Sequence, residues 1–240
     1  MKRNYLFYAV FLAALFSSCD EGRIPEKEIV VTEEGRVVKL TADLAGLDNW
    51  HSDYDVVLAG FAENSSYSAI AKDLSVSIAD NGHVEVVMSG IGDEVRTLEI
   101  CVSNSIRERI ATFYSMEAPA TADTIRMDVG TLDISMYGAI QKTVFADKCI
   151  QCHGAGSGEP AAGLHLTEGR SYADLYGHAS TIIPGQQRVN PGKSSESILY
   201  NILTTDMSAE WAIDHSRLMS EEENLLTLIR KWIDNGAKER

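Results

Sequence analysis

The segments HVEVVMSGI (residues 83–91) and RTLEICVSN (residues 96–104) decide the character of the first half of the chain. Both are short and rich in β-branched side chains, which favour extended backbone. The turn-forming residues from Gly90 to Asp93 favour a loop between them. These two segments therefore predict strands.

Segments of the same kind extend to both sides of this pair. Several alternate apolar and polar residues with the period of two that a half-buried strand requires, as Leu74, Val76 and Ile78 do. Many short strands separated by turns are typical of a β-sandwich, and residues 29–130 are predicted to form an Ig-like one. The further predicted strands are EIVV (28–31), RVVKLTADL (36–44), YDVVLAGF (54–61), LSVSIA (74–79), RIATFYSM (109–116) and TIRMDV (124–129).

The pattern changes after Gly130 from strand-like to helical. In residues 136–148 the apolar residues recur at helical spacing and place Tyr137, Ile140, Val144 and Phe145 on one face. Shorter helices are expected over residues 171–177 and 194–203.

The last predicted helix has the clearest boundaries. Ser220 and Glu223 form an S-x-x-E capping box at its start, and Gly236 suits its end. A β half followed by a helical half predicts a multidomain chain, with an N-terminal all-β sandwich and a C-terminal all-α domain at residues 136–240. The boundary is expected near residues 130–135.

The N-terminus has the features of an export signal. Lys2 and Arg3 precede an apolar run from Tyr5 to Phe16, which is too short to span a bilayer comfortably. Ser17-Ser18-Cys19 then resembles the cleavage site of bacterial lipoproteins, in which the new N-terminal cysteine is lipidated. We therefore predict a signal peptide at 1–18 and a lipidated linker at 19–28. The alternative is an ordinary signal peptide that is cut nearby.

This reading predicts an exported protein that is lipid-anchored to a membrane through Cys19. The outer membrane is expected, on its periplasmic or its surface face. The formal net charge of −14 repels nucleic acids and anionic lipid headgroups, so the nucleic-acid-binding classes are excluded.

Cys149-Ile150-Gln151-Cys152-His153 is a C-x-x-C-H motif. Two thiols three residues apart at the end of a helix reach both vinyl groups on one edge of a porphyrin, and the next imidazole lies beneath the iron. The motif predicts one covalent haem c, with His153 as the proximal iron ligand. Covalent haem attachment takes place outside the cytoplasm, in agreement with the export signal.

Two other chemistries use paired cysteines. A redox disulfide of the thioredoxin type would place the pair in a βαβ context, which the sequence lacks here. A zinc site would need further ligands beyond His165, because no second C-x-x-C is present. Cys101 lies in an alternating apolar stretch and is expected to pack as a small core residue.

Four blocks in this half resemble the cytochrome c domain of many planctomycete-type and related secreted proteins. They are KCIQCHG (148–154), AAGLHL (161–166), VNPGKSSESILYNIL (189–203) and SEEENLLTLIRKWIDNGAKE (220–239). The resemblance covers roughly residues 136–240, and it implies a helical monohaem domain. It also implies that the first and last helices cross, with Phe145 and Trp232 packing near the haem.

The sixth iron ligand departs from the pattern of the related domains, which have Met-Pro in the loop before the last helix. His215 lies at nearly the expected distance before Ser220 and is the first choice. Met219 directly precedes the predicted cap, where it would instead serve as a hydrophobic staple. Met207 is a third choice, and an open five-coordinate iron is a fourth.

The sequence leaves three functions open. The first is a membrane-tethered monohaem carrier that passes one electron to and from a redox partner protein, rather than an enzyme. The second is a surface binding or adhesion lipoprotein, in which Trp50, Tyr54 and Tyr67 recognise a carbohydrate or protein. The third is a haem sensor or enzyme, which requires an open iron position.

Overall fold

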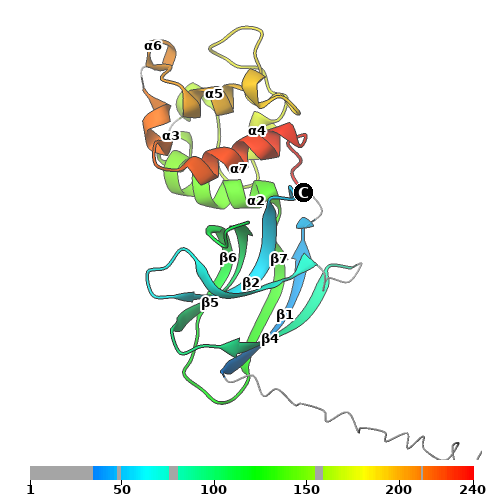
Figure 1. The fold of residues 1–240 in the computed structure, drawn as a ribbon. Coiled ribbons are helices and arrows are strands. Elements are labelled where there is room, and N and C mark those ends of the chain that lie inside the picture. The colour runs from blue at the N-terminus through cyan, green and yellow to red at the C-terminus, as the bar shows by residue number, and fades with distance from the viewer. Residues whose placement is uncertain (1–34, 48–49, 76–80, 155–158, 212) are drawn as a thin grey trace, which may run out of the picture. The chain divides into compact units, whose positions relative to one another are not determined.

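The computed structural model describes residues 35–47, 50–75, 81–154, 159–211 and 213–240, and its ribbon is drawn in Figure 1. The predicted signal peptide, Cys19, the linker and the EIVV strand lie outside these residues, as do Val76 and Ile78. In the described part of the chain, no helix is long and apolar enough to cross a bilayer.

The described strands form two sheets. One sheet has the order β4-β1-β7, with β1 antiparallel to β4 and parallel to β7. The other has the order β3-β2-β5-β6 and is antiparallel throughout. The strands are β1 (Arg36–Ala45), β2 (Tyr54–Ala62), β3 (Ser68–Asp73), β4 (His83–Ile91), β5 (Val95–Asn104), β6 (Arg109–Glu117) and β7 (Ile125–Asp133).

The apolar faces of both sheets belong to one hydrophobic cluster. In β1, every second residue from Val38 to Leu44 is buried, as the predicted alternation requires. On the other face of the antiparallel sheet, Phe61 and Cys101 belong to a second, smaller cluster. The prediction that Cys101 packs as a core residue is therefore confirmed.

Strand β3 was not predicted from the sequence. Its residues, SAIAKD, include alanine, lysine and aspartate, which are uncommon in strands. The segment is extended because it pairs with the edge of β2 from Phe61 to Val57. Tertiary pairing therefore overrides a weak local preference at this position.

The helical segments follow β7 and are short, apart from the last. They are α2 (Met136–Ile140), the π-helix η3 (Gln141–Cys149), α3 (Ile150–His153), η4 (Ala161–Gly163), α4 (Ser171–Leu175), η5 (Ser194–Glu196), α5 (Ile198–Thr204), α6 (Ser208–Trp211), η6 (His215–Met219) and α7 (Glu223–Asp234).

The predicted fold class, with an all-β sandwich domain and a separate C-terminal all-α cytochrome c domain, is wrong. Residues 33–240 form one compact unit that is mostly β-sheet, with seven strands described and few, short helices. The physical reason is that helices of five to seven residues, such as α4 and α5, bury too little surface to pack only on one another. Their apolar residues join the same cluster that fills the space between the sheets. The limits predicted at residues 29–130 and 136–240 stay predictions.

Hydrogen bonds also join the helical part of the chain and the segment that leads into it to the strands and their connecting loops. The indole of Trp50 donates to the carbonyl oxygen of Ile134 at 2.6 Å. Lys142 on η3 donates to the carbonyl of Phe113 on β6 at 3.0 Å. Asn224, at the start of α7, donates to the carboxylate of Glu108 at 3.0 Å.

The last helix begins two residues later than predicted. Glu222 is its N-cap, without a side-chain hydrogen bond, so the predicted capping box is wrong. Ser220 instead ends η6, and its hydroxyl donates to the carbonyl of Arg217. Because Ser220 is the C-cap of this short 3-10 helix, it does not serve as the N-cap of α7.

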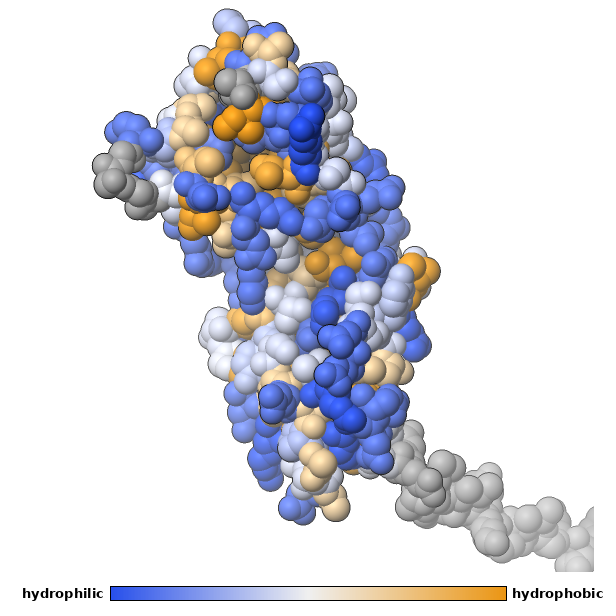
Figure 2. Space-filling view, turned by 90° about the vertical axis from the view of Figure 1, so that its left-hand side faces the viewer, coloured by the Kyte–Doolittle hydropathy of each residue, from blue (hydrophilic) through white to orange (hydrophobic). Residues whose placement is uncertain are grey.

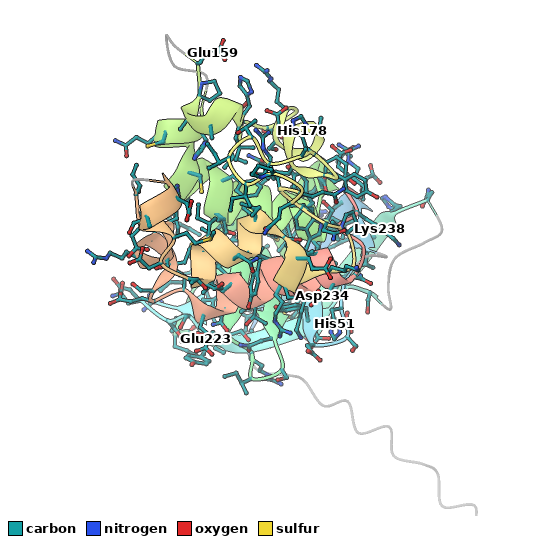
Figure 3. All side chains as sticks on the ribbon, turned by 90° about the horizontal axis from the view of Figure 1, so that it is seen from above. His51, Glu159, His178, Glu223, Asp234 and Lys238 are labelled. Atoms are coloured by element: carbon teal, nitrogen blue, oxygen red, sulfur yellow. The ribbon has the colours of Figure 1, made fainter. Side chains whose placement is uncertain are left out.

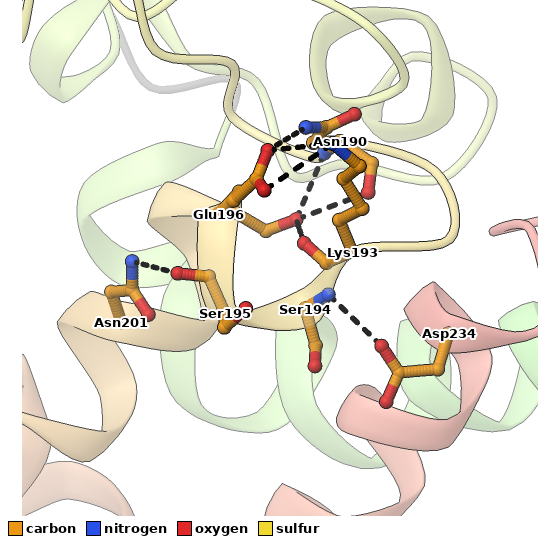
Figure 4. A network of polar contacts seen from close by, with 8 residues as sticks. Asn190, Lys193, Ser194, Ser195, Glu196, Asn201 and Asp234 are labelled. Atoms are coloured by element: carbon orange, nitrogen blue, oxygen red, sulfur yellow. Dashed lines mark hydrogen bonds and ion pairs between the residues drawn. The ribbon is translucent and has the colours of Figure 1, made fainter.

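A polar network connects the end of α7 to the loop that leads into α5 (Figure 4). The backbone N–H of Ser194 donates to the carboxylate of Asp234 at 2.9 Å. Asn190 and Lys193 both bind Glu196. Gly192 has a φ of 82° and donates its N–H to the carbonyl of Ile233. The loop therefore holds α5 at a defined position beside α7.

Because one core spans strands and helices, the strands and helices of the Leu40→Ala protein should unfold in a single transition. Leu40 is fully buried, so we expect a loss of about 2–5 kcal/mol in the free energy of unfolding. Denaturant melts followed by far-ultraviolet circular dichroism and by tryptophan fluorescence should shift by the same amount.

Val87→Ala is the matched control, because Val87 is 49% exposed and should change stability by about 0.5 kcal/mol or less. Two separate transitions in the Leu40→Ala protein would contradict a single cooperative unit.

Candidate functional site

The C-x-x-C-H motif lies at the end of one long helical run. The run starts as α2, widens into the π-helix η3 and finishes as α3 with His153. The N–H of Ile150 bonds to the carbonyl of Phe145, five residues earlier, as in a π-helix. A helix was predicted over 136–148, and it continues through the motif itself. π-Helical turns are frequent at functional sites, since they change the direction in which the following side chains point.

The predicted apolar face of this run is confirmed. Tyr137, Ile140, Val144 and Phe145 are all buried, and Ser135 caps the helix by accepting from the N–H of Gly138. Burial of this face ties the start of the run to the core.

Cys149, Cys152 and His153 open onto a cavity of about 510 Å³. This volume lies within the roughly 300–1,000 Å³ that small-molecule and cofactor sites occupy. Its walls are mainly aliphatic side chains, contributed by η4 and the residues after it, by α4 and by α5. They include Leu164, Leu166, Leu175, Ile198, Leu199 and Ile202.

His215 on η6 lines the same cavity as the motif histidine. The ring centres of His153 and His215 are 6.4 Å apart, with 40° between the ring planes. An iron bound to two imidazole nitrogens, with bonds of about 2 Å and ring centres about 1.2 Å behind each nitrogen, would separate the centres by roughly 6.4 Å. The spacing therefore fits one iron between the two rings.

Each of the two rings places its Nδ1 against a backbone carbonyl oxygen. Nδ1 of His153 lies 3.2 Å from the carbonyl oxygen of Leu164, and Nδ1 of His215 lies 3.1 Å from that of Ile213. A ring that donates through Nδ1 carries its lone pair on Nε2, the atom that binds a metal. Burial also lowers the pKa of His153, which favours the neutral form that a ligand requires.

The turn that carries His215 is held by its N-cap. The carboxylate of Asp214 accepts from the N–H of Ser216 at 3.1 Å and from Nε of Arg217 at 2.9 Å. Asp214 therefore orders the short helix on which the second imidazole lies.

The other predicted sixth ligands are placed differently. Met219 lines the cavity and is only 1% exposed. Met207 packs against the core and is not among the residues that line the cavity. His165 is engaged by Asp174 at 2.9 Å.

Phe145 and Trp232 lie in an aromatic group behind the cavity. Tyr137 is between them, with ring centres 6.2 Å from Phe145 and 5.2 Å from Trp232. Neither residue lines the cavity itself. Phe145 and Trp232 therefore lie where the first helical run packs against α7.

The two motif thiols are free and differ in exposure. Cys149 is half-buried and Cys152 is exposed. Burial raises the pKa of Cys149 to about 11 and that of Cys101 to about 12. Within the described residues, no group of three or more His, Cys, Asp and Glu side chains is arranged to hold a metal ion.

The structure adds Arg188 and Lys148 to the lining of the cavity, and sequence reasoning did not single out either of them. Lys148 directly precedes Cys149, so its position in the sequence could have indicated that it lies beside the cavity. Arg188 is 35 residues farther along the chain than His153, and only the folded loop brings it to the cavity.

The aromatic residues proposed for a binding surface do not share one. Tyr54 is buried, and Trp50 packs edge-on against it at 5.6 Å. Tyr67 is 51% exposed. Two of the three side chains therefore serve the core.

Comparisons with protein-family models, with curated proteins and with solved structures found no match for this chain.

The apo protein offers a test of the thiol environments. Because alkylation requires the thiolate, the exposed Cys152 should react with iodoacetamide before Cys149, whose raised pKa leaves little thiolate at pH 8. Cys101 should react only after unfolding. Time-resolved peptide mass spectrometry measures all three rates, and a faster rate for Cys149 than for Cys152 would contradict this geometry.

Proposed function

We propose that the protein is a membrane-tethered monohaem c-type cytochrome that transfers single electrons. Cys149 and Cys152 would hold the haem covalently, and His153 and His215 would be the ligands of its iron. A haem iron supplies reversible one-electron chemistry.

The observation that carries this proposal is the pair of imidazoles that line one apolar cavity. The ring spacing of 6.4 Å suits a shared iron, and each ring places its Nδ1 at a backbone carbonyl, which puts the lone pair on Nε2. The motif cysteines line the same cavity, which supports covalent attachment at that place.

Two protein ligands favour a carrier over an enzyme or a gas sensor. An iron held by both His153 and His215 would have no position left for a small substrate. Outer-sphere electron transfer needs no such position. The aliphatic walls exclude water, so little solvent has to reorganise when the charge on the iron changes.

The redox partner is a protein that approaches the cavity mouth. Ile182, Ile213 and Leu218 line the cavity and are each about half exposed. Figure 2 shows apolar side chains gathered among polar ones on one face of this helical part. An apolar rim of this kind allows close approach of a partner surface.

The predicted lipid anchor at Cys19 belongs to this proposal. It places the protein at the outer membrane, facing the periplasm or the cell surface, where haem attachment and electron transfer both take place outside the cytoplasm.

The first measurement determines whether haem is covalently attached to the protein. Wild-type protein expressed with a periplasmic haem-attachment system should keep its haem after denaturation and gain the mass of one haem. The double variant Cys149→Ser/Cys152→Ser should lose it, because no thioether can form. Cys101→Ser is the matched control and should retain full loading, and a wild-type protein without covalent haem would end the proposal.

The second measurement concerns the iron ligand from η6. His215→Ala should open one coordination position, so the reduced protein should bind carbon monoxide, which the wild type should not. His215→Met should raise the reduction potential, since methionine raises it relative to histidine.

Met219→Leu is the control, because it conserves volume in the cavity wall and should leave the spectrum unchanged. Carbon monoxide binding by Met219→Leu, but not by His215→Ala, would identify Met219 as the ligand instead.

A further inference from the structure

Arg188 places a buried positive charge at the cavity. The residue lies between α4 and α5, lines the cavity, and is only 6% exposed. Two other charged residues of this part, Glu159 and Glu223, are exposed and lie at the periphery in the view of Figure 3. A guanidinium in such a place requires a reason, because burial of an unpaired charge is costly.

The guanidinium is held in one orientation by backbone carbonyls. Nη1 donates to the carbonyl of Asp174 at 2.9 Å. Nη2 donates to that of Ala162 at 3.0 Å and to that of Gly163 at 3.4 Å. Ala162 and Gly163 both have positive φ, 55° and 58°, so a left-handed turn presents successive carbonyls to the arginine. The side chain is thus positioned before anything binds.

These carbonyls do not neutralise the charge. No ion pair among the described residues includes Arg188. The carboxylate of Asp174, which acts electrostatically on Arg188, is engaged by His165, whose N–H and Nδ1 both lie 2.9 Å from it. Burial lowers the pKa of Arg188, and Asp174 offsets this only in part.

The other cation at the cavity already has a partner. Lys148 donates to the carboxylate of Glu222 at 2.6 Å. Among the described residues that line the cavity, Arg188 is therefore the arginine or lysine that forms no ion pair with a carboxylate.

We infer that Arg188 binds a carboxylate of the bound porphyrin, a propionate group, and thereby sets the charge balance at the iron. The inference rests on the proposed function. An arginine has five N–H donors in a planar fork, and its carbonyl bonds leave donors for one carboxylate. A carboxylate at this place would convert a costly unpaired charge into a hydrogen-bonded pair.

The test compares reduction potentials and their pH dependence in haem-loaded proteins. Arg188→Gln removes the charge, so the potential should fall because the ferric state carries the extra positive charge. The pKa that describes the pH dependence of the potential should rise, since the carboxylate loses the cation that favours its ionised form. Arg126→Gln on β7 is the matched control, with the same loss of charge at an exposed site away from the cavity.

Arg188→Lys separates charge from geometry. Lysine keeps the charge but lacks the fork, so its pH dependence should lie between those of the wild type and Arg188→Gln. If Arg188→Gln does not fold, the pH dependence measured for Arg188→Lys tests the inference by itself.

A potential and a pH profile equal to those of the wild type in either variant, whatever the loss in melting temperature, would make Arg188 a structural residue only and overturn the inference. A wild-type protein that takes up no covalent haem would overturn the proposed function itself, a result that the loading assay distinguishes from the first.

Discussion

The packing of the helical run from Met136 to His153 against α7 is the contact on which the rest of the site depends. Tyr137 lies against Trp232 with ring centres 5.2 Å apart, and Ile140 and Ile229 are fully buried. Aromatic and aliphatic burial of this size is the dominant favourable term in folding. Because the run is anchored at its start, its end is delivered to a defined place, and the motif cysteines and His153 are at that end.

The π-helical segment adjusts the end of that run. A π-turn takes more residues than an α-turn, so the side chains after it are rotated relative to a regular helix. Lys142, in this segment, donates to the carbonyl of Phe113, and Lys148, also in it, binds Glu222 ahead of α7. The segment is therefore fastened to a strand on one side and to the last helix on the other, which limits how far the motif can move.

The cavity combines apolar walls with a few placed polar groups. Two imidazoles with Nδ1 at backbone carbonyls and one buried arginine stand among aliphatic side chains. In such surroundings a charge interacts more strongly than in water, so the few polar groups dominate the electrostatics of anything that binds. This arrangement suits a group that is apolar over most of its surface and charged at a few atoms.

The sequence by itself determined the strands that alternate apolar and polar residues, the apolar face of the first helical run and the C-x-x-C-H motif, because each depends on residues close together in the chain. His215 was also expected, since it lies a short distance before the last helix. Only the tertiary structure decided that strands and helices share one compact unit, that β3 is a strand, and that α7 starts at Glu223. It also decided the spacing of His153 and His215 and brought Arg188 to the cavity. These outcomes depend on contacts between residues far apart in sequence, and local propensity carries no information about such contacts.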